Sequence, residues 1–189
     1  MHPEAFNYVR PYATDKAVSV LDIGGRNVNG SPRELFPHAD PYRVLDILPG
    51  ADVDIVADAA SWVPDRRYDI VLCLETFEHA PMWRDIVRTA YSALSDGGLF
   101  IATMGGPNRV AHSAHDGGPL WPREYYGNVS APDLTIILEK VGFEDFSVEY
   151  DAENCDTRCL ALRPRPPILS ILAVTASATV TRARATTED

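Results

Sequence analysis

The sequence predicts an α/β protein of three layers, in which helices cover a doubly wound, mostly parallel sheet of about seven strands that ends in a C-terminal antiparallel hairpin. Short apolar, β-rich runs alternate with stretches of helical periodicity. The runs are apolar on both faces, which is typical of parallel strands buried between helices. The chain has 189 residues, of which 46% are hydrophobic, enough for one domain with a sizeable core.

Five apolar runs mark the expected parallel strands. The first, AVSVLDI, ends near an aspartate that is followed by two glycines, and the second, YRVLDI, also ends near an aspartate. Because ligands of open α/β sheets bind at the carboxyl ends of the strands, the polar residues that follow these runs are the candidate site residues. In chain order the runs are 17–23, 42–47, 52–57, 68–74 and 98–104.

The first two predicted helices begin at recognisable signals. Ser31 is the expected N-cap of a short helix from about residue 32, because Pro32 suits the first helical position and Glu34 completes a capping box. Pro81 opens the second helix, and Asp-Gly-Gly at 96–98 is expected to turn the chain into the next strand. The second helix carries one apolar stripe, formed by Ile86, Val87, Ala90, Tyr91 and Leu94.

A third helix is predicted for residues 131–141, between a cap at Ser130 and a stop at Gly142. After it, FEDFSVEY (143–150) and TRCLALR (157–163) predict two more strands. The segment between them, DAENCD, is too short for a parallel crossover, which takes a dozen or more residues, so the two strands are expected to be antiparallel.

The chain is expected to divide into one domain and a tail. The domain spans residues 1–163, and residues 1–16 are expected to form a helix that lies over the site as a lid or along the edge of the sheet. Residues 164–189 begin with several prolines and end in the polar stretch TRARATTED. A flexible tail is therefore expected there.

Charge and hydrophobic pattern disfavour several classes of function. The formal net charge is −10, which argues against a broad basic surface for DNA or RNA. The N-terminus shows no apolar signal segment, and the run at 168–180 is too short and too rich in Ser and Thr to span a bilayer well. We therefore expect a soluble, cytoplasmic protein without a membrane or nucleic-acid partner. Cys73, Cys155 and Cys159 are expected to be reduced thiols.

The stretch LDIGGRNVNGS, at 21–31, begins like a nucleotide-binding turn and then departs from it. A dinucleotide fingerprint reads Gly-x-Gly-x-x-Gly, and Arg26 stands where the second glycine belongs. The capped helix also begins later than a pyrophosphate favours, so a smaller zwitterionic group suits the loop better. Asp46 lies 22 residues beyond Gly24, the spacing of an acid that binds ribose hydroxyls. An ordinary turn aspartate is the alternative.

Five motifs follow one another along the chain. They are Asp-Ile-Gly-Gly at 22–25, Asp46, Asp58-Ala59, Glu-Thr-Phe-Glu-His at 75–79 and Leu-Ser-Asp-Gly-Gly-Leu at 94–99. Together they resemble the motifs of class I S-adenosylmethionine-dependent methyltransferases, most closely those of the small type-11-like group, over about residues 18–163. The resemblance implies a Rossmann-like methyltransferase fold, S-adenosylmethionine as the cofactor, and methyl transfer by in-line displacement. Arg26 stands where this family usually has glycine.

The resemblance implies a role for each cofactor-binding candidate. Asp22 and Gly24 would shape the pocket for the methionine end, and Asp46 would hold the ribose hydroxyls. Asp58 would accept a hydrogen bond from the adenine amino group, with the amide of Ala59 at a ring nitrogen. The predicted set is Asp22, Gly24, Gly25, Arg26, Asp46, Ile47, Asp58, Ala59 and, on the floor near the methionine end, Glu75.

The loop GGPNRVAHSAHDGGPLWPREYYGN, at 105–128, is expected to shape the acceptor site, because long loops in such places usually carry function. His79, His112 and His115 are candidates for a general base or for positioning the acceptor, and only a hydroxyl acceptor would need a base. His112, His115 and Asp116 form a weak metal signature, so no metal is predicted. The expected acceptor is a small molecule or a sugar, and the oligomeric state is left open.

Two other functions fit parts of the sequence. A nicotinamide-dependent oxidoreductase would need the full glycine fingerprint and a catalytic Tyr-Lys or His dyad, and Lys16 and Lys140, the only lysines, suit neither role. A non-catalytic module that binds S-adenosylmethionine is the third reading. The acids at four strand ends argue against it.

Overall fold

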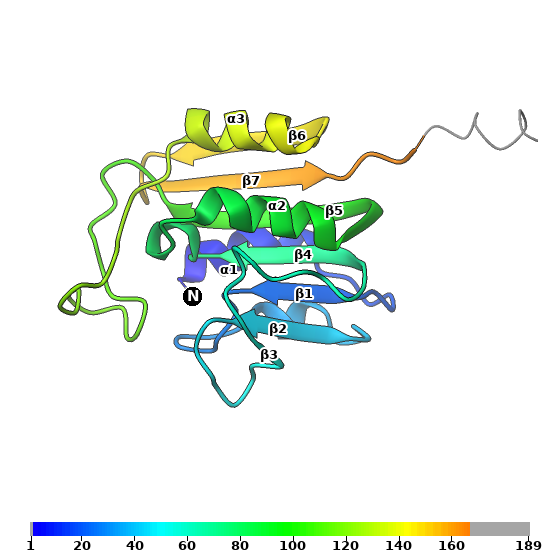
Figure 1. Ribbon diagram of the computed structural model, residues 1–189, viewed down its shortest axis with the longest axis horizontal. Helices are drawn as coiled ribbons and strands as arrows, with labels where there is room; N and C mark the ends of the chain where they lie inside the picture. The colour runs from blue at the N-terminus through cyan, green and yellow to red at the C-terminus, as the bar shows by residue number, and fades with distance from the viewer. Residues whose placement is uncertain (1, 167–189) are drawn as a thin grey trace, which may run out of the picture.

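Seven strands form one mixed sheet in the computed structural model, which describes residues 2–166. Neighbouring strands pair in parallel from β3 to β5, whereas β7 is antiparallel to both β5 and β6 (Figure 1). The predicted doubly wound α/β sheet with a C-terminal antiparallel hairpin is thereby confirmed. In sheet order the strands are β3 (Ile55–Val56), β2 (Tyr42–Asp46), β1 (Val20–Ile23), β4 (Tyr68–Leu74), β5 (Leu94–Gly105), β7 (Asp156–Leu162) and β6 (Asp145–Asp151).

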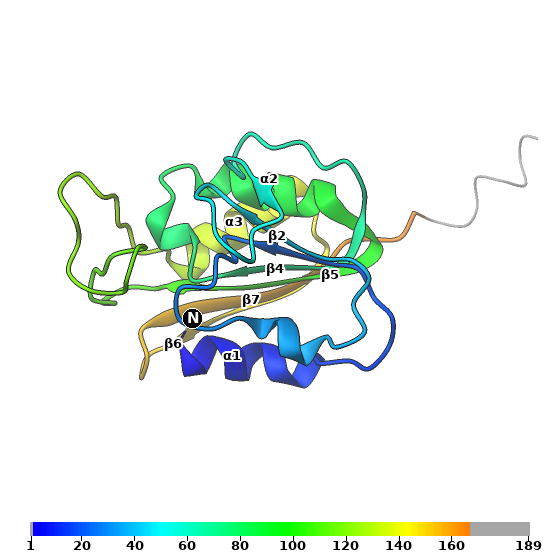
Figure 2. The ribbon, with the colours of Figure 1, turned by 90° about the horizontal axis from the view of Figure 1, so that it is seen from below.

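Helices cover both faces of this sheet (Figure 2). α2 (Trp83–Ala93) and α3 (Ala131–Val141) lie on one face, where their buried side chains join those of β1, β4 and β5 in the larger hydrophobic cluster. α1 (Pro3–Val9) lies on the opposite face, and Val9 is buried in a second cluster with strand residues such as Val20. The strands are therefore buried between two helical layers, as their apolar runs predict.

The N-terminal helix lies on one face of the sheet (Figure 2), where the sequence led us to expect a lid over the site or a helix along the sheet edge. Its Tyr8 ring packs beneath the guanidinium of Arg158 from β7, 5.6 Å from the ring centroid. A 3₁₀ turn, η1 (Arg10–Tyr12), continues the helix. His2, which precedes the helix, lines the cavity at the strand ends. The segment thus supports the sheet along its length and reaches the site only at its start.

The capped segment after Ser31 is a single 3₁₀ turn, η2 (Pro32–Leu35), rather than a short α-helix. Ser31 Oγ accepts a hydrogen bond from the amide of Arg33 over 3.2 Å, so the predicted cap is present. The Glu34 side chain is exposed and makes no return bond among the described residues. Pro37 follows the turn closely and disfavours a helical conformation just before it, so a second turn does not form.

The Asp-Gly-Gly segment at 96–98 lies inside β5, whereas the sequence predicted a turn that ends before the strand begins. Tyr68 pairs with Leu94, but Ile70 pairs with Leu99, so the pairing of β4 and β5 shifts register between them. The additional residues of β5 between these two pairs form a bulge, and the pairing of β4 with β5 resumes after it. The predicted turn is therefore a local irregularity within a longer strand.

The third helix and its two ends agree with the prediction. Ser130 Oγ accepts from the amide of Asp133 over 3.2 Å and caps the start of α3. Gly142 has a φ of 111°, a left-handed conformation that ends the helix and that side chains disfavour. α3 therefore spans the predicted residues, and the chain continues from it into the terminal hairpin.

The predicted flexible tail falls almost wholly on residues 167–189, which lie outside the described part of the chain, as does the apolar run at 168–180. Within residues 2–166, no helix is long and apolar enough to cross a membrane. Cys73, Cys155 and Cys159 are free thiols, and Cys73 is fully buried in β4.

The ends of the long loop after β5 are held close together. The amide of Val129 donates to the carbonyl oxygen of Gly105 over 2.9 Å, which joins the exit of the loop to its entrance. The hairpin between β6 and β7 secures both, because Gly106 donates to Cys155 over 2.8 Å and Thr157 Oγ1 donates to Val129 over 2.7 Å. The loop therefore leaves and re-enters the fold at one place.

Candidate functional site

A cavity of about 700 Å³ lies at the carboxyl ends of the parallel strands, between the turn after β1 and the long loop after β5. Its volume is in the usual range for small-molecule sites. Every residue predicted to contact the cofactor or the acceptor lines it. They are Asp22, Gly24, Gly25, Arg26, Asp46, Ile47, Asp58, Ala59, Glu75, His79, His112 and His115.

The turn after β1 needs both of its glycines. Gly24 has a φ of 74°, and a Cβ atom there would lie 2.1 Å from Thr76 Oγ1. A Cβ atom on Gly25 would lie 2.4 Å from the carboxyl carbon of Asp22. The turn is therefore packed directly onto the end of β4 on one side and onto Asp22 on the other.

Asp22 lies beneath this turn and is 1% exposed. The hydroxyl of Tyr42 donates to its Oδ2 over 2.8 Å. Burial raises the pKa of Asp22 to about 7, although the hydrogen bond from Tyr42 opposes that rise. Asp22 is thus a buried group that changes charge near neutral pH.

Asp46, at the end of β2, is held by two backbone amides. Oδ1 accepts from Leu48 over 2.8 Å, and Oδ2 accepts from Arg26 over 3.2 Å. These bonds fix the carboxylate, and a carboxylate has further lone pairs that can bind a ligand. The next acid, Asp58, closes its own turn by accepting from the amide of Ala60 over 2.9 Å.

The side chain of Arg26 reaches across the cavity mouth. Its aliphatic part passes Gly50, where a Cβ atom would lie 3.1 Å from Arg26 Cγ. Its guanidinium donates to the carbonyl oxygen of Ala114, in the long loop, over 3.3 Å. The residue that departs from the family glycine therefore connects the glycine turn to the loop.

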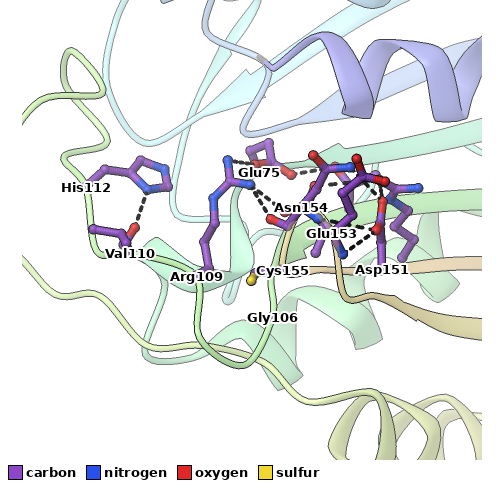
Figure 3. Close-up of polar contacts among 12 residues, drawn as sticks. Glu75, Gly106, Arg109, Val110, His112, Asp151, Glu153, Asn154 and Cys155 are labelled. Carbon is purple, nitrogen blue, oxygen red and sulfur yellow. Dashed lines mark hydrogen bonds and ion pairs between the residues drawn. The ribbon is translucent and has the colours of Figure 1, made fainter.

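Glu75 forms the start of an ion-pair network that sequence reasoning missed (Figure 3). Its Oε1 accepts from Thr103 Oγ1 over 2.8 Å, and its Oε2 lies 3.8 Å from the guanidinium of Arg109. Arg109 also donates to Asp156 over 2.9 Å and to the carbonyl of Asn154 over 2.8 Å. The network ties β4, the long loop and the hairpin together.

Arg109 and Asp156 carried only weak signals in the sequence. Arg109 belongs to the loop predicted to be functional, but nothing there indicated its partners. Asp156 is in DAENCD, which reads as an ordinary turn. It is 1% exposed, and burial followed by the charge of Glu75 raises its pKa to about 6, against the effect of Arg109.

Two of the three candidate histidines lie side by side in the wall of the cavity. The rings of His79 and His112 lie 5.0 Å apart between centroids, and Tyr126 lies 5.3 Å and 5.1 Å from them. Burial lowers the pKa of His79 to about 4, and His112 adds to that effect, so His79 is uncharged at neutral pH. His115 instead stacks on Trp121, at 4.3 Å.

Glu78, next to His79, is buried completely and was not among the predicted site residues. Among the described residues, neither of its carboxyl oxygens has a hydrogen-bond partner of normal geometry, and neither has the buried Nδ1 of His79. Burial and the neighbouring Glu75 raise the pKa of Glu78 well above its usual value. The Glu-His pair belongs to one of the five motifs that carry the resemblance, but only the fold shows that its glutamate is buried.

Comparisons with known proteins agree with this arrangement. A family model described as "Methyltransferase domain" matches residues 4–148. A curated protein of Mycolicibacterium smegmatis, described as a probable S-adenosylmethionine-dependent methyltransferase, is 32% identical over 82 residues, or 43% of this chain. The match spans only 31% of that relative's length.

Solved methyltransferase structures share the fold at low sequence identity. The N-methyltransferase NodS from Bradyrhizobium japonicum, in complex with S-adenosylhomocysteine, is 15% identical, with a TM-score of 0.59 and 86% of each chain covered. The 1,6-didemethyltoxoflavin-N1-methyltransferase of Burkholderia thailandensis is 12% identical, with a TM-score of 0.61, and the similarity covers 86% of this chain and 77% of that one. From the family match over most of its length, the chain belongs to the methyltransferase domain family.

Proposed function

We propose that this chain transfers the methyl group of S-adenosylmethionine to a small-molecule or sugar acceptor. The observation that carries the proposal is the single cavity that joins the glycine turn and the acids after β2 and β3 to the histidines near the long loop. One part suits a nucleoside with an amino-acid end, and the other leaves room for an acceptor. Family membership favours this function over a nicotinamide-dependent oxidoreductase.

The nucleoside half of the cavity is assigned to two acids. Asp46 holds the ribose hydroxyls, because its carboxylate is already fixed by two amides and can accept further, charge-assisted hydrogen bonds. Asp58 binds the adenine amino group, with the Ala59 amide beside it. Ile47, which is exposed in the cavity wall, covers one side of the nucleoside.

The amino-acid end belongs at the glycine turn. The amide of Gly24 donates to Leu45 over 2.7 Å, and the amide of Arg26 is engaged by Asp46, so Gly25 is the turn residue assigned to the ligand carboxylate. Asp22 supports the turn from below. The sulfonium of the bound cofactor supplies an already activated methyl group, so the protein mainly has to place the acceptor in line with it.

The acceptor half is assigned to His79 and the loop histidines. Glu75, assigned to the methionine end, accepts a hydrogen bond from Thr103 Oγ1 and lies 3.8 Å from the guanidinium of Arg109. The rings of His79 and His112 lie side by side, with 5.0 Å between their centroids, so both can help to position an acceptor. Their role is orientation, which dominates when the methyl group is already activated.

Calorimetry tests the cofactor assignment. S-adenosylmethionine and S-adenosylhomocysteine should both bind, and NAD should not. Asp46→Asn should weaken binding of S-adenosylhomocysteine roughly tenfold or more, because charge-assisted bonds to the ribose are lost. Asp65→Asn, in an exposed ion pair with Arg43 far from the cavity lining, is the matched control and should bind normally.

Two results would overturn the proposal. Tight NAD binding without S-adenosylhomocysteine binding would support the alternative function, an oxidoreductase. An unchanged affinity of Asp46→Asn for S-adenosylhomocysteine would refute the ribose assignment. Turnover on a panel of hydroxyl, amine and sugar acceptors, followed by release of S-adenosylhomocysteine, separates an enzyme from a non-catalytic binding module.

A further inference from the structure

Three side chains lie close together where His79 and His112 line the cavity. One carboxyl oxygen of Glu78 and one nitrogen each of His79 and His112 lie within 4.8 Å of one another. Glu78 and His79 come from the 3₁₀ turn after β4, η3 (Phe77–His79), whereas His112 comes from the long loop. Two imidazoles and a carboxylate are a common ligand set for first-row divalent metal ions.

The buried polar atoms of this cluster have no partner within the described part of the chain. Glu78 is 0% exposed, and neither of its oxygens makes a hydrogen bond of normal geometry, although the backbone amides of Glu78 and Gly105 lie close enough to oppose the rise of its pKa. Nδ1 of His79 has no partner either. Arg109, the nearby cation, is engaged by Asp156 and Glu75 instead. Buried polar groups without partners are costly, so a group that satisfies them together is expected.

The orientation of His112 supports a ligand at its far nitrogen. Its Nδ1 lies 3.2 Å from the carbonyl oxygen of Val110 (Figure 3). That contact places the ring proton on Nδ1 and leaves the lone pair of Nε2 free. Metal-binding histidines are typically held in this way, with the other ring N–H donated to a backbone carbonyl or carboxylate.

We propose that Glu78, His79 and His112 bind one divalent first-row transition-metal ion. Ligand atoms about 2.1 Å from a common ion lie about 3.0–3.6 Å apart in octahedral, tetrahedral or trigonal coordination. Atoms that lie up to 4.8 Å apart therefore have to approach one another by about 1–2 Å when the ion binds, which side-chain rotation can supply. Both histidines line the cavity, so an ion held by them would be reachable from it. Glu78 neutralises part of its charge from the buried side.

The proposed ion also connects two parts of the fold. Its ligands would link the loop that carries His112 to the turn after β4, beside the contact between His79 and Tyr126. This differs from the weak sequence signature in the loop, because His115 stacks on Trp121 and is not part of the cluster. The inference goes beyond the proposed methyl transfer, since metal binding is measurable without either substrate.

The test uses tag-free protein, stripped with a chelator and dialysed. Zn²⁺, Mn²⁺ and Co²⁺ are titrated separately by calorimetry, and Co²⁺ binding is also followed by its visible absorption. One equivalent of at least one ion should bind. Glu78→Gln and His112→Ala should each weaken that binding by at least roughly tenfold. His38→Ala, at an exposed histidine away from the cavity, should bind as the parent does.

Each result has a defined meaning. His112 lies on the long loop and is only partly buried, so His112→Ala keeps the test valid if Glu78→Gln fails to fold. Circular dichroism and S-adenosylhomocysteine binding report folding separately. The proposal is overturned by the lack of saturable binding near one equivalent, by binding that neither substitution weakens, or by binding that His115→Ala abolishes while Glu78→Gln and His112→Ala retain it. Metal binding without methyl transfer would leave it standing and would count against the proposed function alone.

Discussion

The guanidinium of Arg26 donates a hydrogen bond to the carbonyl oxygen of Ala114 over 3.3 Å, while the amide of the same residue donates to Asp46. One residue thus contacts both the acid assigned to the ribose and the loop assigned to the acceptor. The glycine that the sequence resemblance leads us to expect at this position could make only the backbone contact.

Arg26→Met should loosen the loop and leave the cofactor half intact. The substitution keeps the aliphatic packing against Gly50 and the amide bond to Asp46 but removes the donors to Ala114. One such hydrogen bond is worth about 1 kcal/mol, so trypsin cleavage after the exposed Arg123 should become roughly fivefold faster. Affinity for S-adenosylhomocysteine should change little. Equal cleavage rates for variant and parent would show that the hydrogen bond from Arg26 to Ala114 does not restrain the loop.

Gly24→Ala should destabilise the protein far more than Gly30→Ala. Both glycines have positive φ, 74° and 111°, so both substitutions add backbone strain of about 1 kcal/mol. Only at Gly24 does the new Cβ meet another residue, at 2.1 Å from Thr76 Oγ1, whereas nothing lies within 4 Å of it at Gly30. Urea unfolding should show a further loss of about 1–3 kcal/mol at Gly24. A similar loss for both variants would mean that the contact with Thr76 is unimportant.

Asp22→Asn should stabilise the protein in a pH-dependent way. The pKa of Asp22 is about 7 in the fold, against 3.8 for the exposed group, so the native state binds more protons than the unfolded state between these values. The free energy of unfolding of the parent therefore falls as pH rises from 4 to 7, by up to about 4 kcal/mol.

Asp22→Asn should accordingly leave the free energy of unfolding nearly unchanged at pH 4 and raise it by the full amount above pH 7. The asparagine can still accept the hydrogen bond from Tyr42, so the comparison isolates the charge. Chemical unfolding of both proteins at pH 4, 5.5, 7 and 8.5 measures it. A gain that does not vary with pH would show that Asp22 ionises normally in the fold.

Arg109→Met should be strongly destabilising. It would remove the cation shared by the buried carboxyls of Glu75 and Asp156 and leave Asp156 only its longer ion pair with Arg158, at 3.8 Å, so a loss of about 3 kcal/mol is expected. Arg88→Met, which breaks an exposed pair with Asp85 on α2, should change stability by only about 0.5 kcal/mol. Thermal and urea unfolding of the two variants give the comparison, and losses of equal size would show that burial of the Arg109 network adds nothing.

Local sequence signals predicted the framework of this protein because strands and helices here are specified by nearby residues. The alternation of apolar runs and helical stripes predicted the sheet, and Ser130 and Gly142 marked both ends of α3. The cavity followed from topology, since the residues after parallel strands meet at one edge. For that reason Asp22, Asp46 and His79 line one cavity although they come from different strands.

What the sequence could not predict depends on contacts between distant segments. Arg109 and Asp156 lie on a loop and a hairpin, and no local pattern pairs them. The burial of Glu78 depends on how that same loop folds back over the turn after β4. The helix expected after Ser31 failed for a local reason, since Pro37 prevents a second turn. The individual roles assigned to the cofactor-binding residues remain predictions.

The two ends of the long loop after β5 lie close together, so the loop can be replaced as a unit. Because Val129 bonds to Gly105 and the hairpin secures both, a segment of different length could be inserted between them without moving a strand of the sheet. Insertions at such closed loops are tolerated well, since the closure entropy grows only slowly with length. Acceptor preference could therefore change during evolution, or by grafting in the laboratory, while the nucleoside half of the protein stays as it is.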